Sequence, residues 1–168
     1  QRCELHGQRR LLWQMEKTMA DTLEERLLSD KAKRPAILDA CVKLIDDEVK
    51  RKGGISGVAI KGGYKVVCKI KPGIIRESMD NLLDDFVRRM EPFWEKHVDG
   101  GGAEKDFATA LAGQKDAVAD ALLGITDDRA KRAQQKTMKK AYEKLRPQAK
   151  KHVAEAVPGV GRTLAPHL

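Results

Sequence analysis

The side chains that could do chemistry in this chain are mainly cations, and they are concentrated in one segment. Residues 129–151 contain ten Lys and Arg residues and one acid, Glu143, whereas the rest of the chain is almost neutral. On a helix, these cations would cover half of the surface and could contact the phosphates of nucleic acid or of an anionic membrane. A solvated basic face without a partner is the alternative. The candidate surface for an anionic partner comprises Arg129, Arg132, Lys136, Lys139, Lys140, Lys144 and Arg146.

A second basic stripe follows from helical spacing in residues 55–70. Lys61, Lys65 and Lys69 line one edge of a helical wheel, and Ala59 and Gly63 belong to the apolar side. Glycine costs about 1 kcal/mol relative to alanine inside a helix, so the glycines here predict close approach of another backbone at Ala59 and Gly63. The segment is a tightly packed helix with a solvated lysine edge, an anion site or, over residues 55–76, a peripheral surface for anionic lipid.

Residues suited to catalysis, metal binding or cofactor binding form no recognisable pattern. The acidic runs at 46–48 and 84–85 lack the Glu-x-x-His spacing of helical di-metal sites, and the four histidines share no ligand spacing. No nucleophile elbow and no phosphate-binding glycine loop occur. The three cysteines are scattered, which predicts reduced thiols in a cytoplasmic protein, with Cys41 in the core. We therefore predict no catalytic, cofactor-binding or metal-binding residues and no enzymatic activity.

The elements that must position these side chains are helices. Apolar residues recur at helical spacing in every long segment, as at Ile37, Cys41 and Ile45. The pattern predicts an all-α fold, a single compact bundle of five to seven helices over residues 19–168, with a flexible Gly-rich loop at 99–103. No apolar run approaches the roughly 20 residues of a membrane span, so no transmembrane segment is predicted.

Helix ends are predicted from capping residues, glycine and proline. We expect Gly124 to end one helix and Thr126 to cap the basic helix, residues 128–151. Pro147 is suited to begin a further helix, which Pro158-Gly159 would end.

The first 18 residues differ from the remainder. Gln1 is not a natural start, whereas Met19 resembles one, so we expect residues 1–18 to be a non-native or flexible N-terminal arm. The arm lacks the long apolar centre and the small-residue cleavage site of a secretory signal.

Six short motifs are distinctive: LLSDKAKRP at 27–35, LIDDEV at 44–49, GVAIKGGYK at 57–65, IKPG at 70–73, ADALLG at 119–124 and YEKLR at 142–146. Together they resemble a family of short bacterial helical proteins of unknown function. The resemblance covers about residues 23–157 and leaves out the N-terminal arm. It implies a helical fold and a bacterial cytoplasmic setting, and it implies no activity.

The sequence favours a non-enzymatic helical protein of the bacterial cytoplasm that acts by binding. Another protein or a second copy of the chain is the first candidate partner. The alternatives are an electrostatic nucleic-acid binder that uses the basic helix 128–151 and a peripheral anionic-lipid binder that uses residues 55–76.

Overall fold

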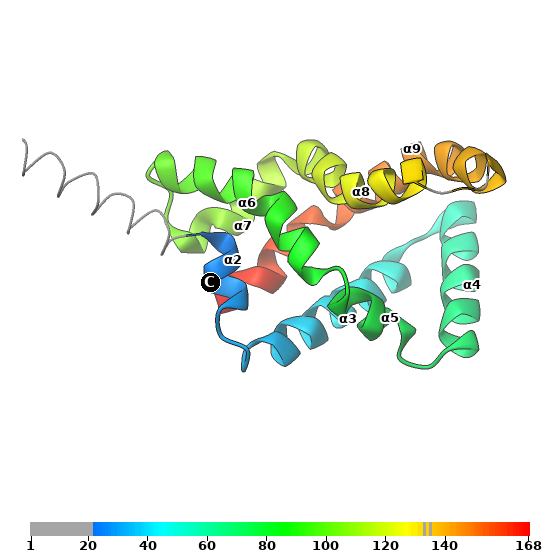
Figure 1. The fold of residues 1–168 in the computed structure, drawn as a ribbon, viewed down its shortest axis with the longest axis horizontal. Helices are drawn as coiled ribbons and strands as arrows, with labels where there is room; N and C mark the ends of the chain where they lie inside the picture. The colour runs from blue at the N-terminus through cyan, green and yellow to red at the C-terminus, as the bar shows by residue number, and fades with distance from the viewer. Residues whose placement is uncertain (1–21, 133, 135) are drawn as a thin grey trace, which may run out of the picture.

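The computed structural model describes residues 22–132, 134 and 136–168, so the expected arm at 1–18 lies outside the described residues (Figure 1). In this part of the chain there are eight α-helices, two short 3-10 helices and no strand. The all-α prediction is confirmed, whereas the expected five to seven helices are slightly too few. The elements are α2 (Leu23–Leu28), α3 (Arg34–Arg51), α4 (Gly54–Ile70), α5 (Ile74–Asp80), α6 (Leu83–Asp99), η1 (Glu104–Asp106), α7 (Phe107–Gly113), α8 (Lys115–Arg132), α9 (Lys136–Leu164) and η2 (Ala165–His167).

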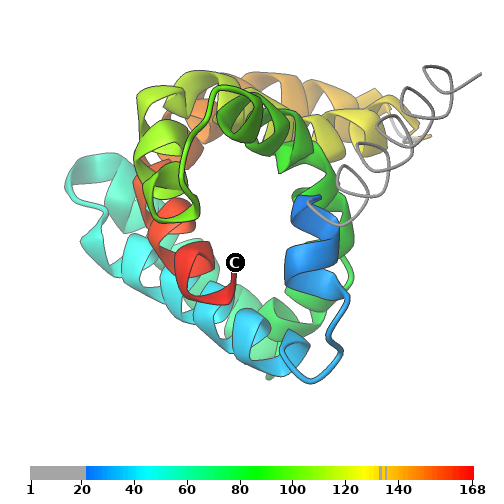
Figure 2. The same cartoon turned by 90° about the vertical axis from the view of Figure 1, so that its left-hand side faces the viewer.

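The helices form a ring when the molecule is viewed along its long axis, and the chain ends inside the outline of that ring (Figure 2). The 29-residue α9 is the longest helix and contacts α3, α7 and α8. In contrast, α4 lies at the end of the molecule away from the C-terminus, and its main contacts are with α3 and α5 (Figure 1). The fold therefore has a well-connected long helix and one peripheral helix.

Among the described residues, α6 contributes four side chains to the hydrophobic core, and α2, α3, α7, α8 and α9 contribute two each. Trp94 of α6 packs edge-on against Phe107 of α7, with ring centroids 5.0 Å apart. The Glu91 carboxylate accepts hydrogen bonds from the backbone N–H groups of Leu23 (2.8 Å) and Glu24 (3.1 Å). These N–H groups at the start of α2 have no acceptor within their own helix, so the two bonds complete their hydrogen bonding and join α2 to α6. None of the described side chains of α4 belongs to this core.

The helix boundary expected at Gly124 and Thr126 is wrong, because α8 continues through both residues to Arg132. The Thr126 hydroxyl donates to the carbonyl of Leu123 at 2.8 Å, an intrahelical bond, instead of capping a new helix. The expected basic helix 128–151 is consequently divided between the end of α8 and the first half of α9.

The boundaries expected at Pro147 and Pro158 are also wrong, since both prolines lie inside α9. A proline in a helix interior costs roughly 3 kcal/mol because it removes a hydrogen bond and crowds the preceding turn. Packing of α9 against three other helices outweighs this local preference, as tertiary contacts commonly do.

The close packing expected at Ala59 and Gly63 is not observed. Both residues are exposed, and a Cβ atom on Gly63 would have no neighbouring atom within 4 Å. Close approaches to a neighbouring helix are found instead in the C-terminal half of α9. A Cβ at Gly161 would lie 2.7 Å from the Cα of Ala108, and one at Gly159 would lie 2.6 Å from Cδ1 of Leu44.

The glycine-rich segment 99–103 turns the chain from α6 towards α7. Gly101 has φ = +76°, in the left-handed region that glycine adopts without steric cost. The N–H of Gly102 donates to the carbonyl of His97 at 2.9 Å, and Nε2 of His97 lies 2.8 Å from the carbonyl oxygen of Ala103. Hydrogen bonds thus close this turn onto the end of α6.

Candidate functional surfaces

One side of α4 attaches it to α3. Tyr64 donates a hydrogen bond from its hydroxyl to the Asp46 carboxylate. Burial, followed by this hydrogen bond, raises the pKa of Tyr64 above its usual value, so the hydroxyl stays protonated and keeps donating. At the start of α4, a Cβ on Gly57 would lie 2.6 Å from the carbonyl carbon of Lys52, so glycine permits this tight connection.

The opposite side of α4 is apolar and exposed. Ile55 is 93% exposed, Val58 73% and Val66 56%. Their spacing places them on one face of the helix together with Ala59 and Gly62, both of which are also exposed. We call this surface the apolar face of α4. It contributes nothing to the described core, so folding does not account for it.

The predicted second basic stripe borders the apolar face. Lys65 and Lys69 are exposed and Lys61 is half-buried. Among the residues that the structure describes, none of these three lysines takes part in an ion pair. Because α4 contains no acidic residue, its outer surface combines aliphatic side chains with unneutralised positive charge.

The predicted anionic-partner surface is distributed over two helices. Arg129 and Arg132 lie in the last turn of α8, and the other five residues belong to the first half of α9. Five of the seven side chains are exposed and two are half-buried; the exposed ones are Arg129, Arg132, Lys136, Lys140 and Lys144, and the half-buried ones are Lys139 and Arg146.

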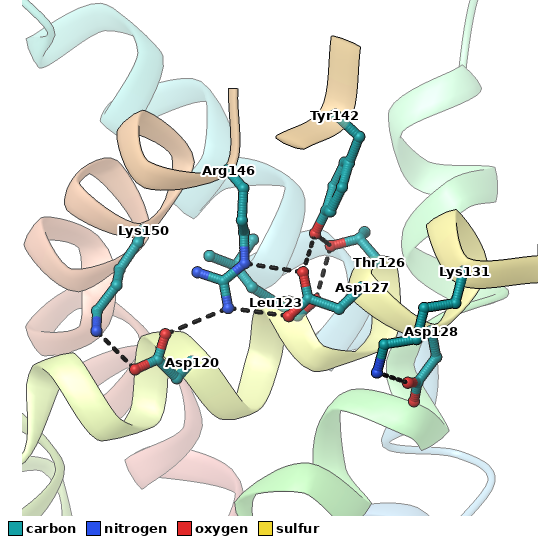
Figure 3. A network of polar contacts seen from close by, with 9 residues as sticks. All are labelled: Asp120, Leu123, Thr126, Asp127, Asp128, Lys131, Tyr142, Arg146 and Lys150. Carbon is teal, nitrogen blue, oxygen red and sulfur yellow. Dashed lines mark hydrogen bonds and ion pairs between the residues drawn. The ribbon is translucent and has the colours of Figure 1, made fainter. Parts of the chain in front are cut away.

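Arg146 is engaged inside the protein (Figure 3). Its guanidinium donates to both oxygens of Asp127 at 2.8 and 2.9 Å and to Asp120 at 3.2 Å. Tyr142 also donates to Asp127 and lies 2.9 Å from the Thr126 hydroxyl. The Arg146 hydrogen bond is the main reason that the pKa of Asp127 falls below its usual value. Arg146 therefore joins α9 to α8 and is not available to an external anion in this arrangement.

The acids of this network were not singled out from the sequence. Asp120 and Asp127 are seven residues apart on α8, while Arg146 and Lys150 are four apart on α9, so each pair lies along one face of its helix. Lys150 completes the set with an ion pair to Asp120 at 2.6 Å. The matching spacings are a signal for facing helices, but they identify the partners only once it is known that α8 and α9 lie against each other.

Both basic surfaces lie towards the same end of the long axis. In Figure 1, α4 and the junction of α8 with α9 are at the end opposite the C-terminus. No helix of the described residues is long and apolar enough to cross a membrane. The described part of the chain also has no cluster of three or more His, Cys, Asp or Glu side chains arranged to hold a metal ion.

Comparison with known proteins adds one finding. A model of a family of unknown function, DUF6918, matches residues 23–168. No curated protein and no solved structure matches the chain.

Proposed function

The chain belongs to the DUF6918 family of unknown function, and we propose, from its structure, that it is a non-catalytic peripheral protein of the bacterial cytoplasm that binds anionic membrane surfaces through α4. The observation that carries the proposal is the outer surface of α4, where the exposed apolar face lies beside three lysines that pair with no acid in the described part of the chain.

Aliphatic and cationic side chains have complementary roles at an anionic bilayer. A helix of this kind lies in the interfacial plane, with its apolar side chains among the acyl chains and its lysines near the headgroups. Ile55, Val58 and Val66 supply the apolar contacts, and each lysine adds about 1 kcal/mol of attraction near the surface. The exposed cations of α8 and α9 at the same end of the molecule would strengthen this attraction.

A nucleic-acid surface explains these features less well. Phosphate contacts require cations, but they do not require three aliphatic side chains exposed by more than half. The basic segment is also partly neutralised, since Asp127 and Asp120 bind Arg146 and Lys150. Aromatic side chains for base stacking are scarce in that segment, where Tyr142 already donates to Asp127.

The test is co-sedimentation of the full chain with vesicles of phosphatidylcholine alone and of phosphatidylcholine with phosphatidylglycerol. We expect binding to the anionic vesicles only, weakening as salt is raised. The triple variant Lys61→Gln, Lys65→Gln and Lys69→Gln should lower the partition coefficient roughly hundredfold, because three lysines contribute about 1 kcal/mol each.

Two further variants separate the apolar and electrostatic contributions. The double variant Ile55→Ser and Val66→Ser should reduce binding while leaving the charge unchanged. The matched control replaces Lys31, Lys33 and Lys105, three exposed lysines outside α4, by glutamine. This control removes the same charge and should retain most of the binding.

The proposal fails if the wild-type chain ignores anionic vesicles, or if the control loses as much binding as the α4 triple variant. Binding to duplex DNA without vesicle binding would assign the cations to nucleic acid instead. Concentration-dependent dimerisation that Ile55→Ser and Val66→Ser abolish, again without vesicle binding, would assign the apolar face to a second copy of the chain.

A further inference from the structure

The molecule contains an apolar cavity of about 380 Å³ that the α4 proposal does not use. Its walls come from α3, α4, α5, α6, α8 and α9. Aliphatic, aromatic and methionine side chains line almost all of it, among them Leu44, Phe86 and Val160. The volume lies within the roughly 300–1,000 Å³ of small-molecule sites and exceeds the ~150 Å³ of an apolar cavity that stays dry and binds benzene.

One edge of this cavity is polar. Glu48, Lys52 and His152 line the cavity and also line a neighbouring hollow of about 340 Å³. The second hollow is completed by polar and charged groups that include Arg51, Lys151 and Glu155. The two spaces are therefore separated by no more than the shared side chains, so an apolar compartment lies directly beside a polar one.

The polar hollow favours an anion. Its cations outnumber its acids even when His152 is neutral, because Arg51, Lys52 and Lys151 face only Glu48 and Glu155. Lys52 pairs with Glu155 at 2.6 Å, and Arg51 pairs with Glu48. Lys151 is exposed and forms no ion pair with any residue that the structure describes.

His152 stands between the two compartments with unmet hydrogen-bonding capacity. Both ring nitrogens are buried, and neither has a hydrogen-bond partner in the described part of the chain. The nearest acidic oxygen, Oε2 of Glu155, is 3.6 Å from Nδ1, which is too long for a hydrogen bond. Since an imidazole always carries at least one N–H donor, an acceptor supplied by a ligand would satisfy it.

We propose that the cavity binds a fatty acid, with its hydrocarbon chain among the apolar walls and its carboxylate in the polar hollow, accepting a hydrogen bond from His152. The cavity volume suits a single chain, and the net positive charge of the hollow suits the carboxylate. This site does not depend on membrane binding by α4, because the residues of that helix that line it, Ile60 in the cavity and Ser56 in the polar hollow, belong neither to the apolar face nor to the lysine stripe.

Isothermal titration of the full chain with dodecanoate, dodecan-1-ol and hexanoate, each below its micelle or solubility limit, tests the proposal. We expect one molecule of dodecanoate per chain, bound at least tenfold more tightly than the alcohol. Hexanoate should bind at least a hundredfold more weakly than dodecanoate, since each methylene contributes about fourfold in Kd.

Variants at His152 test the headgroup contact. His152→Leu should still bind dodecan-1-ol but should lose the tenfold preference for the carboxylate. His152→Gln retains an N–H donor and should keep part of that preference. If His152→Leu discriminates acid from alcohol as well as the wild type does, the carboxylate lies elsewhere and the assignment is wrong.

Variants that fill the cavity test the location of the chain. Ala156→Leu on α9 should weaken both twelve-carbon ligands at least tenfold, and Cys41→Leu fills the same space from α3 if the first variant does not fold. The matched control is Ala117→Leu, which adds the same side chain at an exposed position of α8 and should bind like the wild type. Absence of saturable dodecanoate binding, or equal weakening by the control, would overturn the proposal. The triple lysine variant of α4 should bind dodecanoate normally, so the two proposals can fail separately.

Discussion

α4 and the C-terminal half of α9 both contain glycines within a helix, but these glycines have opposite surroundings. Gly159 and Gly161 of α9 face Leu44 and Ala108 so closely that a Cβ atom would collide with either neighbour. Gly62 and Gly63 of α4 have no atom within 4 Å of a Cβ position. A glycine in a helical pattern therefore identifies a weak point of the helix, and only the tertiary structure shows whether close packing offsets the cost.

The same contrast extends to the apolar residues of the two segments. Val157 and Leu164 of α9 are almost completely buried, whereas Ile55 and Val58 of α4 are mostly exposed. Residues of α9 thus stabilise the fold, and the outer residues of α4 do not. Features that folding leaves unexplained are where a binding function is expected, which is why the α4 surface supports the membrane proposal.

The largest predicted effect is at the tight contact of α9. Gly161→Ala should lower the free energy of unfolding by roughly 2–3 kcal/mol, in the upper part of the overpacking range, because the opposing atoms belong to the backbone and Cβ of Ala108. Urea denaturation monitored by tryptophan fluorescence measures this change. A neutral result would mean that α7 and α9 are farther apart in solution, and the contrast with α4 would disappear.

The second prediction concerns the network that holds the first half of α9 on α8. Asp127→Asn should cost about 1–1.5 kcal/mol at pH 7, because charge-assisted hydrogen bonds from Arg146 are lost at a site that is only partly exposed. The pKa of Asp127 is lowered in the folded protein, so its stabilising contribution is present above the unfolded value near 3.8 and is lost as pH falls through the folded value. The difference between wild type and variant should therefore shrink below about pH 4.

Urea titrations at several pH values between 7 and 3 measure this difference. Asp99→Asn is the control, because Asp99 is exposed at the end of α6 and has no ion pair in the described chain. Its effect should be small at every pH. If Asp127→Asn costs nothing at pH 7, the network is not formed in solution, and Arg146 returns to the set of cations available to an anionic partner.

Periodicity was sufficient to predict the helical character of the chain, but local end signals were not sufficient to place every boundary. The helix expected from the spacing in residues 55–70 corresponds closely to α4, Gly54–Ile70. The helix starts expected at Thr126 and Pro147 were wrong for two reasons. A threonine inside a helix can donate a hydrogen bond to a carbonyl of the same helix, and tertiary contacts can outweigh the cost of a proline in a helix interior. The proline effect depends on residues distant in sequence, whereas the Thr126 bond is a local alternative to capping.

The candidate surfaces were predictable to a similar extent. The spacing of Lys61, Lys65 and Lys69 was enough to place them along one edge of a helix, and the structure has them beside the apolar face. A helical wheel cannot show which apolar side meets a neighbour, so the assignment of Gly63 to a packed interface was wrong. The partners of Arg146 and the surroundings of His152 were not predictable, since they involve helices brought together by the fold.

The smallest predicted effect has the opposite sign. Gly63→Ala should raise the free energy of unfolding by about 0.5–1 kcal/mol, because alanine has the higher helix propensity and its methyl group enters open space. Hydrogen exchange should show the stabilisation locally, as slower exchange of the α4 amides, with the amides of α9 unchanged.

Together, Gly63→Ala and Gly161→Ala test the difference between α4 and α9 directly. The same substitution is made in both helices, and the predicted changes in the free energy of unfolding have opposite signs. Gly63→Ala should leave vesicle binding intact, since the residue lies beside the apolar face and the lysines are untouched. Destabilisation by Gly63→Ala would show that something covers the outer side of α4 in solution. A second copy of the chain is the first occupant to test in that case, by measuring whether the loss of stability depends on protein concentration.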